Sequence, residues 1–233
     1  TEKARAVFYW TASNISYDID NMFAINFNEN EQDQINKTLE SKKGICMHYA
    51  RVFNDIANKV GVKTVEVEGY TMQNGFTDYI PHLWCASEID GDWYVFDPTW
   101  GSGYIKNGKF VKKINNDYFK VNPWKIIETH MPFDYLWQFM NFPITNQEFY
   151  SHNTKIDRSK LFFDFDKEIS LYETLDEIAK LEASVVRIEA MGVKNAMIFD
   201  RLAWKKRQLE YLKMKKNMDD FSVITNTYNV AIN

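Results

Sequence analysis

Apolar side chains recur at spacings of three and four between residues 45 and 60, and this pattern predicts a helix. Gly61 follows where glycine commonly ends a helix, and Gly44 closes the loop that precedes it. Cys46 is therefore expected in the first turn of the helix. The apolar stripe consists of Tyr49, Val52, Phe53, Ile56, Ala57 and Val60.

Residues 82–87 and 93–97 are short runs rich in aromatic and β-branched side chains, which predicts two strands. The Asp-Gly pair at residues 90–91 is a strong signal for a two-residue hairpin turn between them. Residues 62–70 alternate in polarity and predict a further strand. A turn-rich loop at residues 73–78 would border a cleft and could help to select substrate.

The character of the chain changes after residue 150. We therefore predict a core over residues 1–150, followed by a linker and a helical appendage over residues 151–233. Residues 171–218 carry two apolar stripes at helical spacing with Gly192 between them, which favours two antiparallel helices. The appendage is expected to pack on the core or to self-associate with a second copy. Short strands are also expected at residues 161–163 and 221–232.

Three side chains in these elements carry the groups that a thiol-based acyl-transfer enzyme needs. The free N–H groups and the dipole at a helix start would stabilise the thiolate of Cys46 and could hold an oxyanion. A two-residue turn pairs residues whose numbers sum to 181. This register makes His82 and Asp97 diagonal neighbours on one face of the hairpin, about 7–8 Å apart at their Cα atoms. The pattern predicts a nucleophile, a base and an acid that orients the base.

A zinc site is the chemical alternative, because Cys46, His48, His82 and Cys85 form a two-cysteine, two-histidine set. Residues two apart on a helix, and residues three apart on a strand, point in different directions. The spacing therefore argues against zinc, and neither a metal nor another cofactor is expected. His48 is expected on the helix surface or behind the site, and Cys85 as a packed strand thiol.

The segments around the three groups resemble the transglutaminase-like superfamily of papain-related cysteine enzymes. The resemblance covers residues 3–150 and rests on a Cys box at 44–50, a His box at 81–84 and an Asp box at 93–100, in that order. Residues 129–149 are similar to a segment of kyphoscoliosis-peptidase-like members. Met47-His48 after the cysteine and Leu83 after the histidine depart from the usual pattern.

The resemblance implies an α+β fold: a papain/transglutaminase-like core, with the cysteine at a helix N-terminus packed on an antiparallel sheet, and a C-terminal helical hairpin. It also implies a Cys46, His82 and Asp97 triad. Trp84 and Tyr70 are the expected substrate-binding residues. His130, in the run Thr129-His130-Met131-Pro132, is expected to serve packing or hydrogen bonding rather than proton transfer.

The expected reaction is acyl transfer on amide bonds through a thioester, by a peptidase or amidase that acts on a protein or peptide. A protein-glutamine transglutaminase shares the first half-reaction, so the triad does not choose between them. A non-catalytic binding or scaffold module that retains the fold is an alternative from another class. An arylamine acetyltransferase fits the hairpin and the Asp box less well.

The composition of the chain indicates which classes of partner it can bind and in which environment it can fold. A chain of 233 residues with 45% hydrophobic and 16% aromatic content can bury a sizeable core. Its net charge of −4 and its dispersed lysines argue against nucleic acid. Two cysteines on different elements do not suggest a disulfide framework. The sequence has no run of about 18 apolar residues, so it predicts no membrane span.

The chain starts at Thr1 and leads straight into a helix, without an initiator methionine or a signal sequence. This start suggests a fragment whose targeting segment was removed. Because bacterial relatives are commonly exported, the resemblance implies a periplasmic or cell-surface location.

Overall fold

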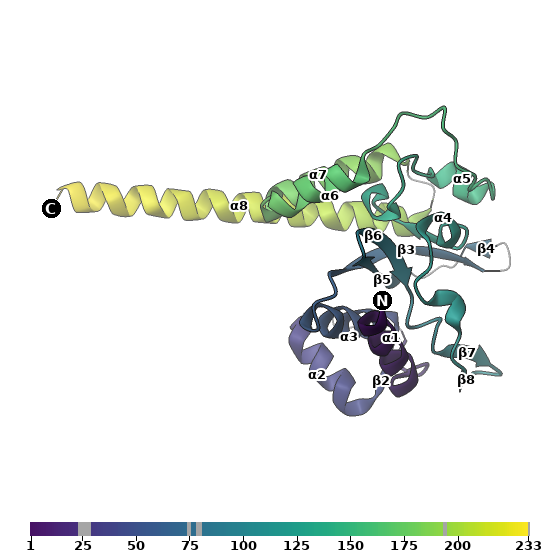
Figure 1. The fold of residues 1–233 in the computed structure, drawn as a ribbon. Helices are drawn as coiled ribbons and strands as arrows, with labels where there is room; N and C mark the ends of the chain where they lie inside the picture. The colour runs from purple at the N-terminus through teal and green to yellow at the C-terminus, as the bar shows by residue number, and fades with distance from the viewer. Residues whose placement is uncertain (23–28, 74–75, 78–80, 193–194, 233) are drawn as a thin grey trace.

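A computed structural model describes residues 1–22, 29–73, 76–77, 81–192 and 195–232 of the chain. An antiparallel sheet lies at its centre, with helices on both sides (Figure 1). The strand order is β4-β3-β5-β6, and β9 also pairs with β3. The strand bounds are β3 Thr64–Gln73, β4 Phe76–Thr77, β5 His82–Ile89, β6 Asp92–Phe96 and β9 His130–Pro132.

The β5–β6 hairpin has the predicted register. Ile89 pairs with Asp92, and the ladder runs to Cys85 opposite Phe96, so that paired numbers sum to 181. Asp90 and Gly91 both have positive φ, at 58° and 89°, as a two-residue turn that follows the twist of the strands requires. Local turn chemistry thus sets which side chains of the two strands share a face.

One face of the sheet is covered by α1 Glu2–Asn14 and α3 Cys46–Lys59, and α2 Glu31–Ser41 packs on α3. Phe8 of α1 and Phe53 of α3 share a core with Phe96 and Cys85 of the sheet. The α3 helix has the predicted extent, and Gly61 just beyond it has a φ of +81°. Its buried stripe faces the sheet, which directs the helix start towards the N-terminal end of β5.

The opposite face is covered by later helices. Tyr70 of β3 and Met131 of β9 lie in one core with Ile188 and Ile198, so the C-terminal helices pack directly on the sheet. The predicted boundary at residue 150 stays a prediction. The elements are α4 Pro123–Ile126, 3₁₀ helix η2 Tyr135–Gln138, α5 Asn146–Tyr150, α6 Phe165–Thr174, α7 Glu177–Ala190 and α8 Ala196–Ile232.

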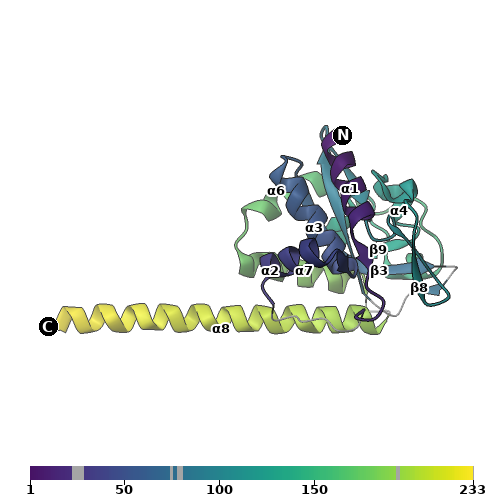
Figure 2. The same cartoon turned by 90° about the horizontal axis from the view of Figure 1, so that it is seen from below.

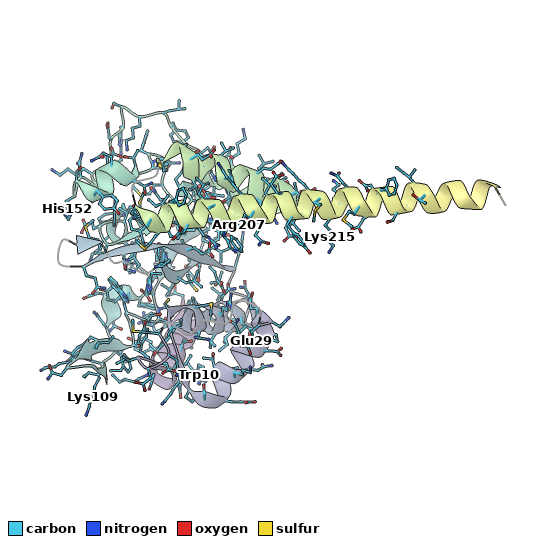
Figure 3. The ribbon with its side chains drawn as sticks, turned by 180° about the vertical axis from the view of Figure 1, so that it is seen from behind. Trp10, Glu29, Lys109, His152, Arg207 and Lys215 are labelled. Atoms are coloured by element: carbon cyan, nitrogen blue, oxygen red, sulfur yellow. The ribbon has the colours of Figure 1, made fainter. Side chains whose placement is uncertain are left out.

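The predicted helical pair around Gly192 is present as α7 and α8, but both predicted C-terminal strands are wrong. Residues 221–232 continue α8, whose second half projects from the body beyond Arg207 and past Lys215 (Figures 1 and 3). Their β-branched side chains bias the backbone only weakly, and a strand needs a partner strand. Residues 161–163 have no ladder, and Leu161 is 92% exposed.

Two small sheets lie at the edge of the molecule. Strand β1 Ser16–Tyr17 runs parallel to β2 Lys43–Gly44, which leads into α3. Strands β7 Gly103–Lys106 and β8 Lys109–Lys112 form a hairpin, followed by 3₁₀ helix η1 Asn116–Tyr118. Seen from below, β8 lies on the far side of the molecule from the projecting end of α8 (Figure 2). None of the described helices is both long and apolar enough to span a membrane.

Candidate active site

Cys46 is the first residue of α3, and the turn before it is tightly built. The backbone N–H of Ile45 donates to Nδ1 of His48 over 3.1 Å. A Cβ on Gly44 would lie only 2.5 Å from the Cβ of His48, so this close approach requires glycine. His48 therefore supports the turn from behind the site. This is one of the two positions that the sequence predicted for it, the other being the helix surface. The N–H groups of this first turn have no partner within the helix.

His82 and Asp97 are hydrogen-bonded, with 2.7 Å between Nε2 of the imidazole and Oδ2 of the carboxylate. The pairing predicted from the hairpin register is therefore present. Oδ1 of Asp97 accepts the N–H groups of Thr99 and Trp100 at 2.8 and 3.1 Å. Asp97 is fully buried, so these bonds hold its carboxylate in one orientation.

A second histidine contacts the same carboxylate. Nε2 of His130 lies 3.1 Å from Oδ2 of Asp97, and its Nδ1 lies 2.8 Å from the hydroxyl of Thr129. The expected hydrogen-bonding role of His130 is consistent with this position. Its place beside Asp97 was not predicted, because it depends on the pairing of β9 with β3, where His130 lies opposite Thr71.

The three groups perturb one another's pKa values in the direction that favours an ion pair. Burial works to raise the pKa of the Cys46 thiol, but a hydrogen bond and the charge of His82, with an N–H of Leu83, lower it overall. Burial opposes protonation of His82, yet the charge and hydrogen bond of Asp97 raise its pKa to about 10. The pKa of Asp97 falls well below its usual range despite burial, because both histidines stabilise its charge.

A cleft of about 1110 Å³ opens over Cys46 and His82. Tyr17 lines it from β1, a position that the sequence did not reveal because it depends on the pairing of β1 with β2. Burial and the charges of Cys46 and Asp97 raise the pKa of Tyr17 to about 12. The phenol therefore stays protonated at neutral pH and can donate a hydrogen bond near the thiol.

The two expected substrate-binding residues do not line this cleft. Tyr70 is fully buried in the core under α7 and α8, and its hydroxyl donates to Oδ1 of Asn146 over 2.7 Å. Trp84 is also buried, with its ring 5.9 Å from that of His82 and 5.1 Å from that of His130. Trp84 packs behind the histidines, so the structure places neither side chain where a substrate would touch it.

The four residues of the alternative zinc site do not converge. Cys85 is buried on the other face of β5, where its thiol donates to the carbonyl of Ala50 over 3.2 Å, and His48 is used in the turn. Among the described residues, His82, Asp97 and His130 do place donor atoms within 4.8 Å of one another. Those donors are of metal-ligating type, and here they hydrogen-bond to each other.

Cys46 should react faster than Cys85 with iodoacetamide, and the difference should persist below pH 8.5, where an ordinary thiol loses its thiolate. The cause is that His82 lowers the pKa of Cys46, whereas burial raises the pKa of Cys85 well above its usual value. Alkylation at graded pH, followed by mass mapping of both cysteines, measures this difference.

His82→Ala is the variant that identifies the cause. Without the imidazole, burial and the charge of Asp97 raise the pKa of Cys46 and only the N–H of Leu83 opposes them, so this pKa should rise and labelling at pH 6–7 should fall towards that of Cys85. Equal labelling of both thiols in the parent protein would instead support the non-catalytic scaffold.

Comparisons with known proteins show which family and which relatives the chain resembles. Residues 1–98 match the family described as the transglutaminase-like superfamily. The chain is 29% identical to the mouse (Mus musculus) kyphoscoliosis peptidase over 169 residues, which are 69% of this chain and 25% of that protein. It is 30% identical to the human (Homo sapiens) kyphoscoliosis peptidase over 156 residues, which are 64% of this chain and 23% of that protein.

The chain thus spans about a quarter of the length of these curated relatives. Among solved structures, it resembles one described as a TGase at 20% identity and a TM-score of 0.34. That match covers 50% of this chain and 30% of the other.

Proposed function

Because the N-terminal part of this chain belongs to the transglutaminase-like superfamily, whose fold is that of cysteine-type acyl-transfer proteins, we propose that it hydrolyses amide bonds as a cysteine peptidase or amidase. The observation that carries the proposal is the position of His82, which bonds to Cys46 on one side and to Asp97 on the other, at the cleft. The curated relatives are named peptidases, which supports the same reaction class.

The reaction would begin with the thiolate of Cys46. Nε2 of His82 is bound to Asp97, which leaves Nδ1 to take the proton of the thiol. The thiolate attacks the carbonyl carbon of an amide, and the charge that develops on its oxygen faces the N–H groups at the start of α3. The hydroxyl of Tyr17 is a further donor at this side of the cleft.

The carbon–nitrogen bond then breaks, the amine leaves with a proton from His82, and a thioester joins the acyl group to Cys46. Water attacks this thioester while His82 accepts one of its protons. The products are a carboxylic acid and an amine, and the thiol is restored, so one amide and one water molecule are consumed. An acceptor amine in place of water would give transglutamination by the same first half-reaction.

Cys46→Ala should abolish turnover of peptide substrates, because no other group supplies the nucleophile in this mechanism. Stability should change little, since the sulfur borders a cleft and its loss leaves only a small buried cavity. The assay is mass spectrometry of a panel of casein, glutamine-containing and cell-wall peptides, with urea unfolding of the variant alongside.

Added primary amine separates the two reactions. Hydrolysis yields products whose summed mass exceeds that of the substrate by one water molecule. Transfer yields adducts with the added amine, which hydrolysis does not form. Cys85→Ala is the matched control, because it removes the other thiol at a distance from the cleft. A folded parent protein with an unreactive Cys46 and no turnover across the panel would refute the proposal in favour of a scaffold.

A further inference from the structure

Apolar side chains line one wall of the cleft and continue away from Cys46 along the β7–β8 hairpin. Phe110 and Ile105 lie opposite each other in the hairpin ladder, so they share a face. The ring of Phe110 is 6.4 Å from the ring of Tyr17, whose phenol is within electrostatic reach of Cys46. The ring of Tyr17 is therefore near both the thiol of Cys46 and the β7–β8 hairpin.

The side chains on this side of the cleft are exposed or half-buried, although the surrounding core is well covered. Ile105 is 51% exposed and Tyr104 is 48% exposed, and both line the cleft together with Phe110 and Ile114. Single exposed apolar residues are common on protein surfaces, but a cluster within one cleft marks a binding surface. The hairpin wall, defined as Tyr104, Ile105, Phe110 and Ile114, is such a cluster.

The wall is held in place before any ligand arrives. Nζ of Lys112 donates to the carbonyls of Ala12 and Ser13 at the end of α1, at 2.9 and 3.1 Å. The N–H of Lys113 donates to the carbonyl of Ser102 over 3.0 Å, which ties β8 to the turn after Asp97. Lys109 lies at the outer end of the hairpin, away from the body (Figure 3). Because the wall is already ordered, less conformational entropy is lost when a ligand binds.

The charged residues of the cleft do not select a charged ligand. Lys113 and Asp117 both line it, and their opposite charges give no net preference for an anion or a cation. The contact area at this end is therefore mainly aliphatic and aromatic. Because an extended peptide advances about 3.3 Å per residue, a side chain a few residues from an amide at Cys46 can reach the wall.

We propose that the hairpin wall is a substrate subsite that selects peptides with a large aliphatic or aromatic side chain within about three residues on the acyl side of the scissile amide. The inference rests on the proposed peptidase function and names its substrate class. Ile105 and Phe110 bind that side chain, and the rest of the peptide follows the cleft past Cys46.

Peptide chloromethyl ketones test this subsite without requiring turnover. A series in an alanine background carries leucine or serine at each of the three positions nearest the reactive group. At one position or more, the leucine probe should alkylate Cys46 about tenfold faster than its serine partner, relative to iodoacetamide, as apolar pockets typically discriminate. Ile105→Ser should remove this preference.

Leu161→Ser is the matched control, because Leu161 is a large apolar side chain that is 92% exposed and is not among the residues lining the cleft. It should keep the full preference for leucine. Ile105→Thr retains a β-branched residue suited to a strand and serves if Ile105→Ser fails to fold.

Equal rates for leucine and serine at every position would overturn the subsite, as would a preference that survives in both Ile105→Ser and Phe110→Ser. Failure of the proposed function has a different signature: Cys46 would then show no selective labelling by iodoacetamide, and no peptide would be turned over by the parent protein.

Discussion

Asp97→Asn should reduce peptide turnover by a factor on the order of 10⁴, the loss that the same change causes in serine proteases. An amide N–H₂ in place of Oδ2 would face Nε2 of both histidines, so each ring must accept there. His82 would then carry its proton on Nδ1, towards Cys46, and could not take the proton of the thiol. The pKa of Cys46 should rise, and iodoacetamide labelling at pH 7 should fall with kcat/KM.

The remaining amide oxygen can still accept the N–H groups of Thr99 and Trp100, so the turn after β6 should persist and urea unfolding should show a folded variant. A folded Asp97→Asn protein that keeps its Cys46 labelling rate would contradict the assigned orientation of His82.

His130→Asn is the graded comparison. Asparagine can still donate a hydrogen bond, and the bond between His82 and Asp97 is left in place. Labelling of Cys46 should therefore stay within about tenfold of the parent, since one hydrogen bond to a charged group contributes about 1.5–3 kcal/mol and only part of it is lost. If a folded His130→Asn variant loses as much Cys46 labelling as Asp97→Asn does, His130 takes part in the proton transfer.

Arg187→Met should lower the free energy of unfolding by about 3–5 kcal/mol, the usual cost of leaving one partner of a buried ion pair uncompensated. Arg187 of α7 donates to both carboxylate oxygens of Asp134, from Nε over 2.6 Å and from Nη2 over 2.8 Å. Both side chains are buried, so methionine would strand the charge of Asp134. Urea unfolding at pH 7 measures the loss.

Arg187→Met with Asp134→Asn is the matched control. Asparagine is neutral, and its oxygen can still accept the N–H of Leu136, which Oδ1 of Asp134 accepts over 3.1 Å. The double variant should recover most of the lost stability. A double variant no more stable than the single one would show that packing of the guanidinium, not charge, holds α7.

Several parts of the structure followed from local patterns. The apolar stripe and Gly61 predicted α3 with Cys46 in its first turn, because helix periodicity and capping depend on a few neighbouring residues. The Asp-Gly pair predicted the hairpin register, and with it the contact between His82 and Asp97. These two local signals sufficed to identify the candidate active site.

Other features depend on contacts between distant parts of the chain. The pairing of β9 with β3 brings His130 to Asp97, and the pairing of β1 with β2 brings Tyr17 to the cleft. Packing of α7 and α8 on the sheet buries Tyr70, which was expected from the sequence to bind substrate. For residues 221–232, β-branched composition suggested a strand, but continuing a helix needs no partner, whereas a strand does. Local patterns determined the elements that hold Cys46, His82 and Asp97, and only tertiary packing decided which other side chains surround them, because such contacts leave no local sequence signal.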